Sequence, residues 1–164
     1  MPPPDRAFRA DQILRVLTEH RVDFVVIGGV AVQAHGYTRL TKDLDIVASP
    51  DILNFARLSE ALAELEAELR TPGTLRLVDA HQLQRAPQIP VLTSAGPLDV
   101  VSVDHVAGAP KDYAALRNAA LEVELDGVLI PFAGLSDLIR MKRAAGREHD
   151  LMDIEALTRD AEST

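Results

Sequence analysis

The sequence of 164 residues contains no cysteine. This absence excludes a disulfide framework, a thiolate nucleophile and a zinc site built on cysteine. No apolar run is long enough to form a membrane helix, and the start of the chain lacks the basic and apolar regions of a signal peptide. Together these absences predict a cytoplasmic protein with no membrane partner.

Basic residues are also scarce: 17 Lys and Arg stand against 25 Asp and Glu, which gives a net charge of −8. A protein that coats nucleic acid needs a basic face, so this charge argues against that class, although it is compatible with RNA held by a local basic patch. The length favours one domain over residues 1–164, in which the Pro-rich residues 1–5 are expected to be disordered.

Apolar spacing and turn residues alternate along the chain in a way that predicts an α/β (α+β) fold. Helices are expected over residues 5–20, 30–36, 49–69, a short stretch after Pro110, 136–146 and 148–161, with Ser49 and Ser136 as N-caps. Strands are expected over residues 23–27, 43–47, 74–80, the two halves of 88–103, and a hairpin over 121–132. The predicted architecture is a mixed β-sheet of about four to six strands flanked by helices.

The strand expected at 43–47 carries two aspartates, Asp43 and Asp45. Residues i and i+2 of a strand point to the same face, so both carboxylates crowd one side. Asp99 lies in a later strand, LDVVSV. Three converging carboxylates repel one another unless cations lie between them, and Mg²⁺ prefers oxygen ligands. The other interpretation places the aspartates on the solvated face of a half-exposed strand.

Gly28 and Gly29 follow the strand DFVVI and open a short helix. Such a turn lets backbone N–H groups approach a phosphate, although glycine pairs also make ordinary turns. The glycine patterns of dinucleotide-binding folds and P-loops are both missing. Arg39 and Thr41 lie in the loop that leads to the aspartates. A basic and a hydroxyl side chain are therefore expected near the same end of the sheet.

These features occur in the segment IGGVAVQAHGYTRLTKDLDIV, which resembles the signature of the polymerase-β-type nucleotidyltransferase superfamily. That signature is a glycine pair, a short helix, Asp-x-Asp in the next strand and a third Asp on a later strand. The segment DLIRMKRAAGREHDLMDIEAL resembles small bacterial nucleotidyltransferases of abortive-infection and toxin–antitoxin systems. The resemblance extends over residues 13–157 and implies the nucleotidyltransferase fold.

The resemblance implies a metal-dependent enzyme that moves an NMP from an NTP to an acceptor hydroxyl and releases pyrophosphate. It implies that Asp43, Asp45 and Asp99 bind Mg²⁺ or Mn²⁺ and act in catalysis. Gly28 and Gly29 correspond to the turn that binds the phosphates of the NTP.

Further positions of the nucleotide site follow from the same resemblance. Lys142 corresponds to a helix lysine that reaches the triphosphate, and Arg39 and Thr41 are expected beside the nucleotide. The sequence departs from the family pattern at two places. Gly29 stands where many members have Ser, and His149 stands where relatives often have Lys. Both departures concern how the nucleotide is held rather than the metal site.

The resemblance leaves the acceptor open among a tRNA end, a protein and a small molecule. It also implies an antitoxin partner if the chain is the toxin of a toxin–antitoxin pair. The alternative is a catalytically inactive nucleotide-binding or partner-binding protein that retains the fold. An assay for nucleotidyl transfer with Mg²⁺ and each labelled NTP distinguishes an active enzyme from such an inactive binding protein.

Two other groups of polar residues have less specific interpretations. Asp150 and Asp153, spaced i and i+3 on the last helix, are expected to face solvent or to pair with Arg147 and Arg143. His35 is expected either to line the nucleotide pocket or to be a structural histidine.

Overall fold

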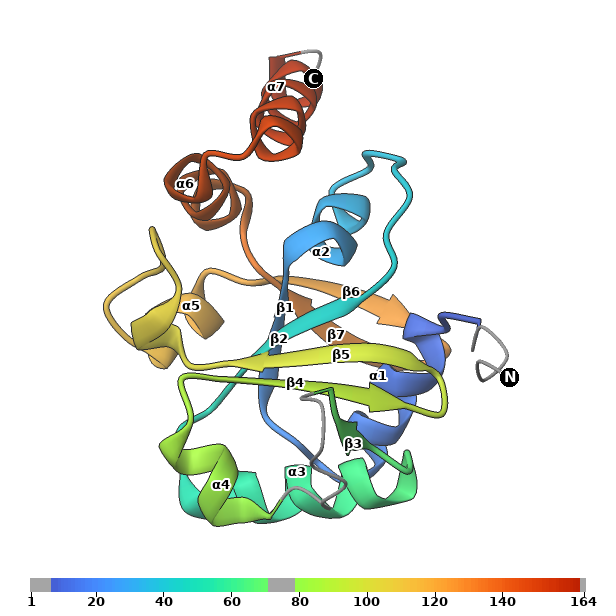
Figure 1. Cartoon of the computed structure of the whole chain (residues 1–164). Helices are drawn as coiled ribbons and strands as arrows, with labels where there is room; N and C mark the ends of the chain where they lie inside the picture. Colours follow the sequence, from blue (N-terminus) through green and yellow to red (C-terminus); the bar gives the residue numbers. More distant parts are fainter. Residues whose placement is uncertain (1–6, 71–78, 163–164) are drawn as a thin grey trace.

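The computed structural model describes residues 7–70 and 79–162 of the chain (Figure 1). The disordered start expected at residues 1–5 lies outside these ranges, as does most of the strand expected at 74–80. The last two residues of that expected strand are instead the N-cap and the first residue of a helix, because Asp79 and Gln82 form a capping box.

Within the described residues the fold is built on a mixed sheet of seven strands, in the order β3-β4-β5-β2-β1-β7-β6. Along the chain these are β1 (Phe24–Ile27), β2 (Leu44–Ala48), β3 (Glu68–Leu69), β4 (Gln88–Thr93), β5 (Gly96–Val101), β6 (Leu121–Leu125) and β7 (Val128–Phe132). β2 runs parallel to β5 and antiparallel to β1, and β1 runs parallel to β7. The predicted mixed sheet flanked by helices is confirmed, but it has seven strands where about four to six were expected, and the short strand β3 forms one edge.

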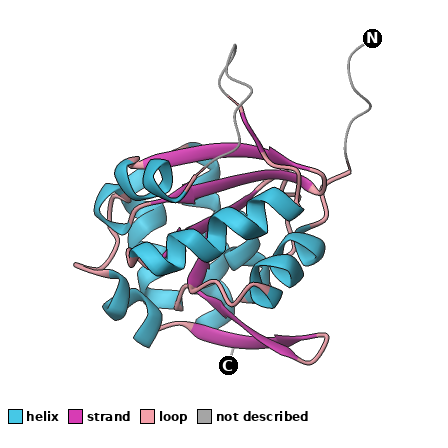
Figure 2. Ribbon diagram, turned by 90° about the horizontal axis from the view of Figure 1, so that it is seen from below, coloured by secondary structure: helices cyan, strands magenta, loops and turns pink. Residues whose placement is uncertain are grey.

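The helices of the described residues are α1 (Ala10–Glu19), α2 (Gly28–Ala34), α3 (Ile52–Glu64), α4 (Ala80–Arg85), α5 (Tyr113–Asn118), α6 (Leu135–Ala145) and α7 (Glu148–Glu162), with a 3-10 turn η1 (Val103–His105). α1, α3 and α4 lie together on the lower side of the sheet in Figure 1, and Figure 2 shows helices crossing the strands on that side. α2, α6 and α7 gather at the opposite end, beyond the end of β1. None of the described helices combines the length and apolar character needed to cross a bilayer.

The two central strands, β1 and β2, form the middle of the core. All four residues of β1 are buried, and Leu44, Ile46 and Val47 of β2 are fully buried. A strand in this position is covered on both faces, so it reads as a continuous apolar run. Asp45 interrupts the run and is only half-buried. A carboxylate in such surroundings needs a positive charge or hydrogen-bond donors nearby to offset its lost hydration.

The N-cap of α3 differs from the prediction. Asp51 caps this helix, because its side chain accepts a hydrogen bond from the backbone N–H of Leu53. The N–H of Ser49 donates to the carbonyl of Asp23 and so continues the pairing of β2 with the chain before β1. Ser49 is therefore still part of the sheet and is not the cap.

The N-cap of α6 also differs, because Ser136 lies inside the first turn of the helix. The cap residue is Gly134, which has no capping side chain. A Cβ at position 134 would lie 2.3 Å from the carbonyl oxygen of Ala119. This close approach of two backbone segments requires glycine, and it decides where α6 begins.

Candidate active site

Asp43, Asp45 and Asp99 meet at one end of the sheet. β2 and β5 are parallel neighbours whose register pairs Asp45 with Asp99, so these two side chains project from the same face. Asp43 lies one residue before β2 begins. One carboxylate oxygen of each residue lies within 4.8 Å of the others. Because Asp99 is only 9% exposed, a solvated strand face does not describe this cluster.

The crowding changes the acid strength of the central carboxyl group. Burial raises the pKa of Asp45 from 3.8 to about 7, together with the charges of Asp43 and Asp99 and a hydrogen bond that protonated Asp45 donates to Asp99, while Lys142 opposes the rise. A carboxyl group with this pKa is partly protonated at neutral pH unless a cation balances the negative charge. The carboxylate cluster, defined as Asp43, Asp45 and Asp99, therefore favours a cation beside it.

Gly28 and Gly29 form the turn between β1 and α2, next to Asp45. Gly28 has a φ of +72°, and a Cβ there would lie 2.3 Å from Asp45 Oδ2. Glycine is therefore required by the backbone conformation and by the close carboxylate. A Cβ at Gly29 would lie 2.9 Å from Thr41 Oγ1. Thr41 thus places a hydroxyl group beside the position where many nucleotidyltransferases resembling this chain carry Ser.

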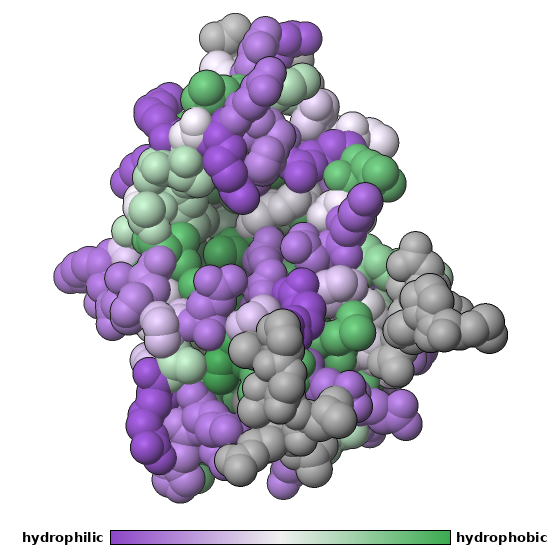
Figure 3. Space-filling model, viewed as in Figure 1, coloured by the Kyte–Doolittle hydropathy of each residue, from purple (hydrophilic) through white to green (hydrophobic). Residues whose placement is uncertain are grey.

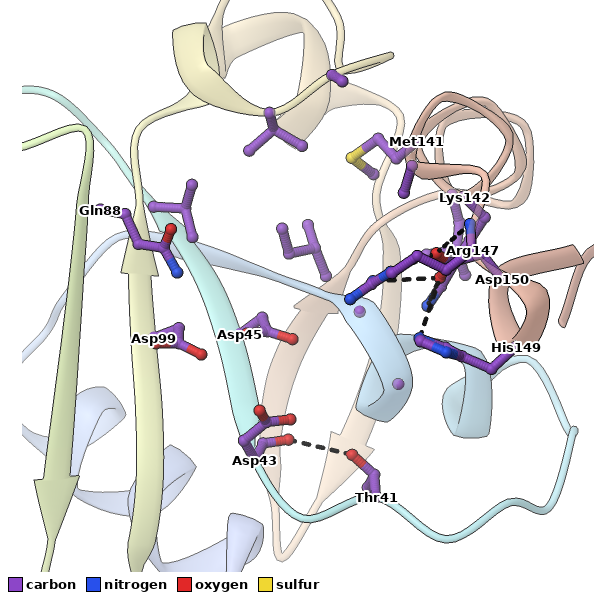
Figure 4. A pocket seen from close by; sticks show the side chains of 18 of the residues that line it. Thr41, Asp43, Asp45, Gln88, Asp99, Met141, Lys142, Arg147, His149 and Asp150 are labelled. Atoms are coloured by element: carbon purple, nitrogen blue, oxygen red, sulfur yellow. Dashed lines mark hydrogen bonds and ion pairs between the residues drawn. The ribbon is translucent and has the colours of Figure 1, made fainter. Parts of the chain in front are cut away.

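A cavity of about 600 Å³ opens above the carboxylate cluster (Figure 4). In the space-filling view of Figure 3, this face of the molecule is hollowed below α6 and α7, with hydrophilic residues around the opening. Cavities of this size are typical of small-molecule sites. The predicted site residues that line it are Gly28, Gly29, Arg39, Thr41, Asp43, Asp45, Asp99 and Lys142.

Lys142 lies in the wall of this cavity but is itself only 6% exposed. Its Nζ is 3.1 Å from Asp150 Oδ1 and 3.1 Å from Asp153 Oδ2. Both aspartates are buried on α7, so the interpretation that they face solvent is wrong. A buried ammonium group requires carboxylate partners to offset its lost hydration, and α7 supplies two.

Asp153 also pairs with Arg39 rather than with Arg143. One buried carboxylate therefore links the loop between α2 and β2 to helices α6 and α7. In contrast, the predicted pairing of Asp150 with Arg147 is present, with Nε 2.6 Å from Oδ2. Burial would raise the pKa of Asp150, but hydrogen bonds from Arg147 and Lys142 outweigh it and hold that pKa below its ordinary value.

Arg147 extends from the start of α7 into the cavity (Figure 4). The hydrogen bond to Asp150 raises the pKa of its guanidinium, and the charges of Asp45 and Asp43 raise it further. The guanidinium therefore lies within the field of the carboxylate cluster, where it can meet an anionic group that binds there.

Residues 5–159 match the protein family described as nucleotidyltransferase of unknown function (DUF6036). The chain belongs to this family. The match confirms the resemblance to nucleotidyltransferases and the assignment of the chain to the nucleotidyltransferase enzymes. No curated protein sequence matches the chain.

Several solved nucleotidyltransferase structures share the fold. The lincosamide antibiotic adenylyltransferase LnuA, in a lincomycin-bound structure, is 14% identical with a TM-score of 0.64, over 93% of this chain and 98% of that chain. The antibiotic-resistance factor ANT(2'')-Ia is 15% identical with a TM-score of 0.52, over 93% of this chain and 89% of that chain. An antigenic nucleotidyltransferase-like protein from Paracoccidioides brasiliensis is 16% identical with a TM-score of 0.54, over 92% of this chain and 77% of that chain. At these identities the likeness shows the fold alone.

Two features of this nucleotidyltransferase site were not predicted from the sequence. Gln88 of β4 and His105 of η1 line the cavity, although neither belongs to a chemical motif. Arg70, which follows β3, forms an ion pair with Asp99 in which Nη2 lies 2.5 Å from Oδ1. For His35 the structural interpretation holds, because its Nε2 lies 2.8 Å from the carbonyl oxygen of Ala133.

Proposed function

We propose that this nucleotidyltransferase uses Mg²⁺ or Mn²⁺, held by Asp43, Asp45 and Asp99, to transfer an NMP from an NTP to an acceptor hydroxyl. The observation that carries the proposal is the convergence of three carboxylate oxygens within 4.8 Å beside a glycine turn. The acceptor hydroxyl loses its proton to solvent as its oxygen forms a bond to the α-phosphorus. The bond from that phosphorus to the oxygen it shares with the β-phosphorus breaks, and pyrophosphate leaves.

The donor set fits a hard divalent cation. All three side chains offer carboxylate oxygens, which Mg²⁺ and Mn²⁺ prefer. Burial first, and then the charges of Asp43 and Asp99, raise the pKa of Asp45, so a cation would stabilise its charged form. When bound, the cation supplies Lewis-acid stabilisation of charge on the transferred phosphoryl group and on the leaving pyrophosphate. A solvated group of surface aspartates would not need such compensation.

The other residues of the cavity position the nucleotide. Gly28 and Gly29 line the cavity at the turn after β1, where backbone N–H groups can bind the phosphates. Arg39 and Arg147 supply positive charge from two walls of the cavity, which stabilises charge that develops on the phosphates. Lys142 adds to this field, although its ammonium group is shared with two aspartates. Asp99 also orients the acceptor hydroxyl.

For the acceptor we favour a small hydroxylated molecule, with ATP as the nucleotide. The support comes from fold neighbours: LnuA is an antibiotic adenylyltransferase with lincomycin bound, and ANT(2'')-Ia, with a TM-score of 0.50, has been solved with adenylyl-2''-tobramycin. A tRNA end or a protein acceptor, an antitoxin partner and the cytoplasmic location stay predictions from the sequence.

Transfer of a labelled phosphoryl group tests this function. The protein is incubated with Mg²⁺ and each α-³²P-labelled NTP, with lincosamides, aminoglycosides, total RNA or a protein extract as the acceptor. We expect label from ATP in a small molecule, with an equal amount of pyrophosphate released. Label in RNA or protein would show that the acceptor is that macromolecule and not a small molecule. Nucleotide binding without pyrophosphate release from any mixture would support the inactive binding protein instead.

A further inference from the structure

Arg70 contacts the carboxylate cluster from outside the cavity. Its Nη2 lies 2.5 Å from Asp99 Oδ1, and Arg70 is not part of the cavity wall. Within residues 7–70 and 79–162, this is the ion pair that the structure records for the cluster, since Arg39 and Lys142 pair with aspartates of α7. The guanidinium of Arg70 therefore occupies one oxygen of a proposed metal ligand.

The register of three neighbouring strands explains how Arg70 reaches Asp99. Asp99 of β5 pairs with Pro90 of β4, and the N–H of Arg70 donates to the Pro90 carbonyl at 3.0 Å. The three residues thus form a row across the sheet with their side chains on one face. Neighbouring strands are about 4.8 Å apart, so a long side chain at residue 70 can pass over the compact Pro90 ring.

Pro90 also limits the backbone pairing of Arg70 with β4. In a hydrogen-bonded antiparallel pair the two residues exchange two backbone hydrogen bonds, but proline has no N–H to return. β3 accordingly ends at Leu69, and Arg70 keeps one bond to Pro90. The side chain of Arg70 is 31% exposed. The guanidinium therefore has access to solvent when it leaves Asp99.

We propose that Arg70 competes with the divalent cation for Asp99, and that it keeps the affinity of the carboxylate cluster for a cation alone low. This inference rests on the proposed metal site. A guanidinium paired with Asp99 neutralises part of the cluster and repels a second positive charge, and a divalent ion doubles that repulsion. A cation that arrives with an NTP gains phosphate ligands, so it displaces Arg70 more readily than a free cation does.

The competing structural explanation is that Arg70 only orients Asp99 for the cation. In that case its loss would weaken cation binding, because the carboxylate would become free to rotate. Repulsion between two close positive charges is larger than the cost of freeing one side-chain torsion. We therefore expect neutral substitutions of Arg70 to strengthen binding of the cation, and the direction of the change distinguishes the two explanations.

Titration with Mn²⁺ in the absence of nucleotide tests the proposal, with unbound Mn²⁺ measured by electron paramagnetic resonance. We expect Arg70→Met and Arg70→Gln to bind Mn²⁺ about tenfold more tightly than wild type, because a charge-assisted hydrogen bond no longer opposes the ion. Arg70→Lys keeps the positive charge and is expected to stay close to wild type. Two neutral variants are used so that the test does not depend on one of them folding.

The matched control is Arg117→Met, which removes the same charge from an Arg–carboxylate pair with Glu122 at 2.7 Å. It is expected to bind Mn²⁺ as wild type does. If Asp99→Asn loses Mn²⁺ binding but the neutral Arg70 variants equal wild type or bind more weakly, the competition is wrong and the metal site stands. If neither wild type nor the neutral variants bind Mn²⁺, even with ATP, the metal site is wrong and this inference falls with it.

Discussion

Asp45→Asn is expected to make the protein more stable than wild type at pH 8 when no divalent cation is present. Burial and the charges of Asp43 and Asp99 raise the pKa of Asp45 to about 7, so this group favours folding only while it is protonated. The stability that it contributes is complete below its unfolded pKa of 3.8 and is lost as the pH rises through about 7. We expect a gain of at least about 1 kcal/mol, the equivalent of one pKa unit.

The stabilisation of Asp45→Asn relative to wild type is expected to depend on pH. The difference in unfolding free energy between Asp45→Asn and wild type should narrow as the pH falls from about 7 towards 4. Denaturation with urea in EDTA at several pH values measures it. Asp126→Asn, in the exposed turn between β6 and β7, is the matched control and should follow wild type at every pH.

With Mg²⁺ and ATP bound, wild type should become more stable than Asp45→Asn. At a hundredfold excess over Kd, wild type is expected to gain about 2.7 kcal/mol by mass action, and Asp45→Asn should lose most of that gain together with nucleotidyl transfer. Melting curves with and without Mg²⁺ and ATP show both effects. An apo variant less stable than wild type, with an undiminished shift on ligand addition, would mean that Asp45 is structural.

Lys142→Ala is expected to destabilise the protein by about 1.5–3 kcal/mol, because two buried carboxylates lose their shared cation and each keeps only one arginine partner. Asp150 is fully buried and Asp153 is 2% exposed, so water cannot replace the ammonium group. Arg143→Ala, at the next and exposed position of α6, should change stability by less than about 0.5 kcal/mol. Urea denaturation of the three proteins compares them.

A second measurement separates the pairing from simple loss of packing. Lys142→Met combined with Asp150→Asn and Asp153→Asn should recover part of the lost stability, because no charged carboxylate is then buried, although Arg39 and Arg147 lose their partners. Where Lys142→Ala remains folded, it should also weaken Mg²⁺–ATP binding more than Arg143→Ala does. Equal stability of Lys142→Ala and Arg143→Ala would contradict the buried ion pairs of Lys142. A larger loss of Mg²⁺–ATP binding in Arg143→Ala would mean that Arg143, and not Lys142, faces the nucleotide.

The carboxylate cluster was predictable in part because residues two apart on a strand share a face. The strand period sets Asp43 and Asp45 two residues apart, and Asp99 lies within an apolar run that predicts a buried strand. The glycine turn was recognisable from its position directly after β1. The sequence does not contain the register that pairs Asp45 with Asp99, and only the fold could bring the third carboxylate to the other two.

The charged residues around the cluster were harder to predict. Asp150 and Asp153 have the spacing of an exposed helix face, and their burial depends on partners from another helix and from a loop, Lys142 and Arg39. Arg70 gives no signal in the sequence, because its contact with Asp99 depends on the register of three strands. Such pairs between distant segments follow from tertiary packing rather than from local pattern.

Calorimetric titration of ATP into wild type, once with Mg²⁺ and once with EDTA, tests the metal site most directly. Without a cation, the carboxylate cluster repels a triphosphate, whereas a bound divalent ion turns that repulsion into attraction. The proposed site predicts saturable ATP binding with Mg²⁺ and a loss of at least about tenfold in affinity with EDTA. Equal affinity under both conditions would contradict a metal site formed by Asp43, Asp45 and Asp99.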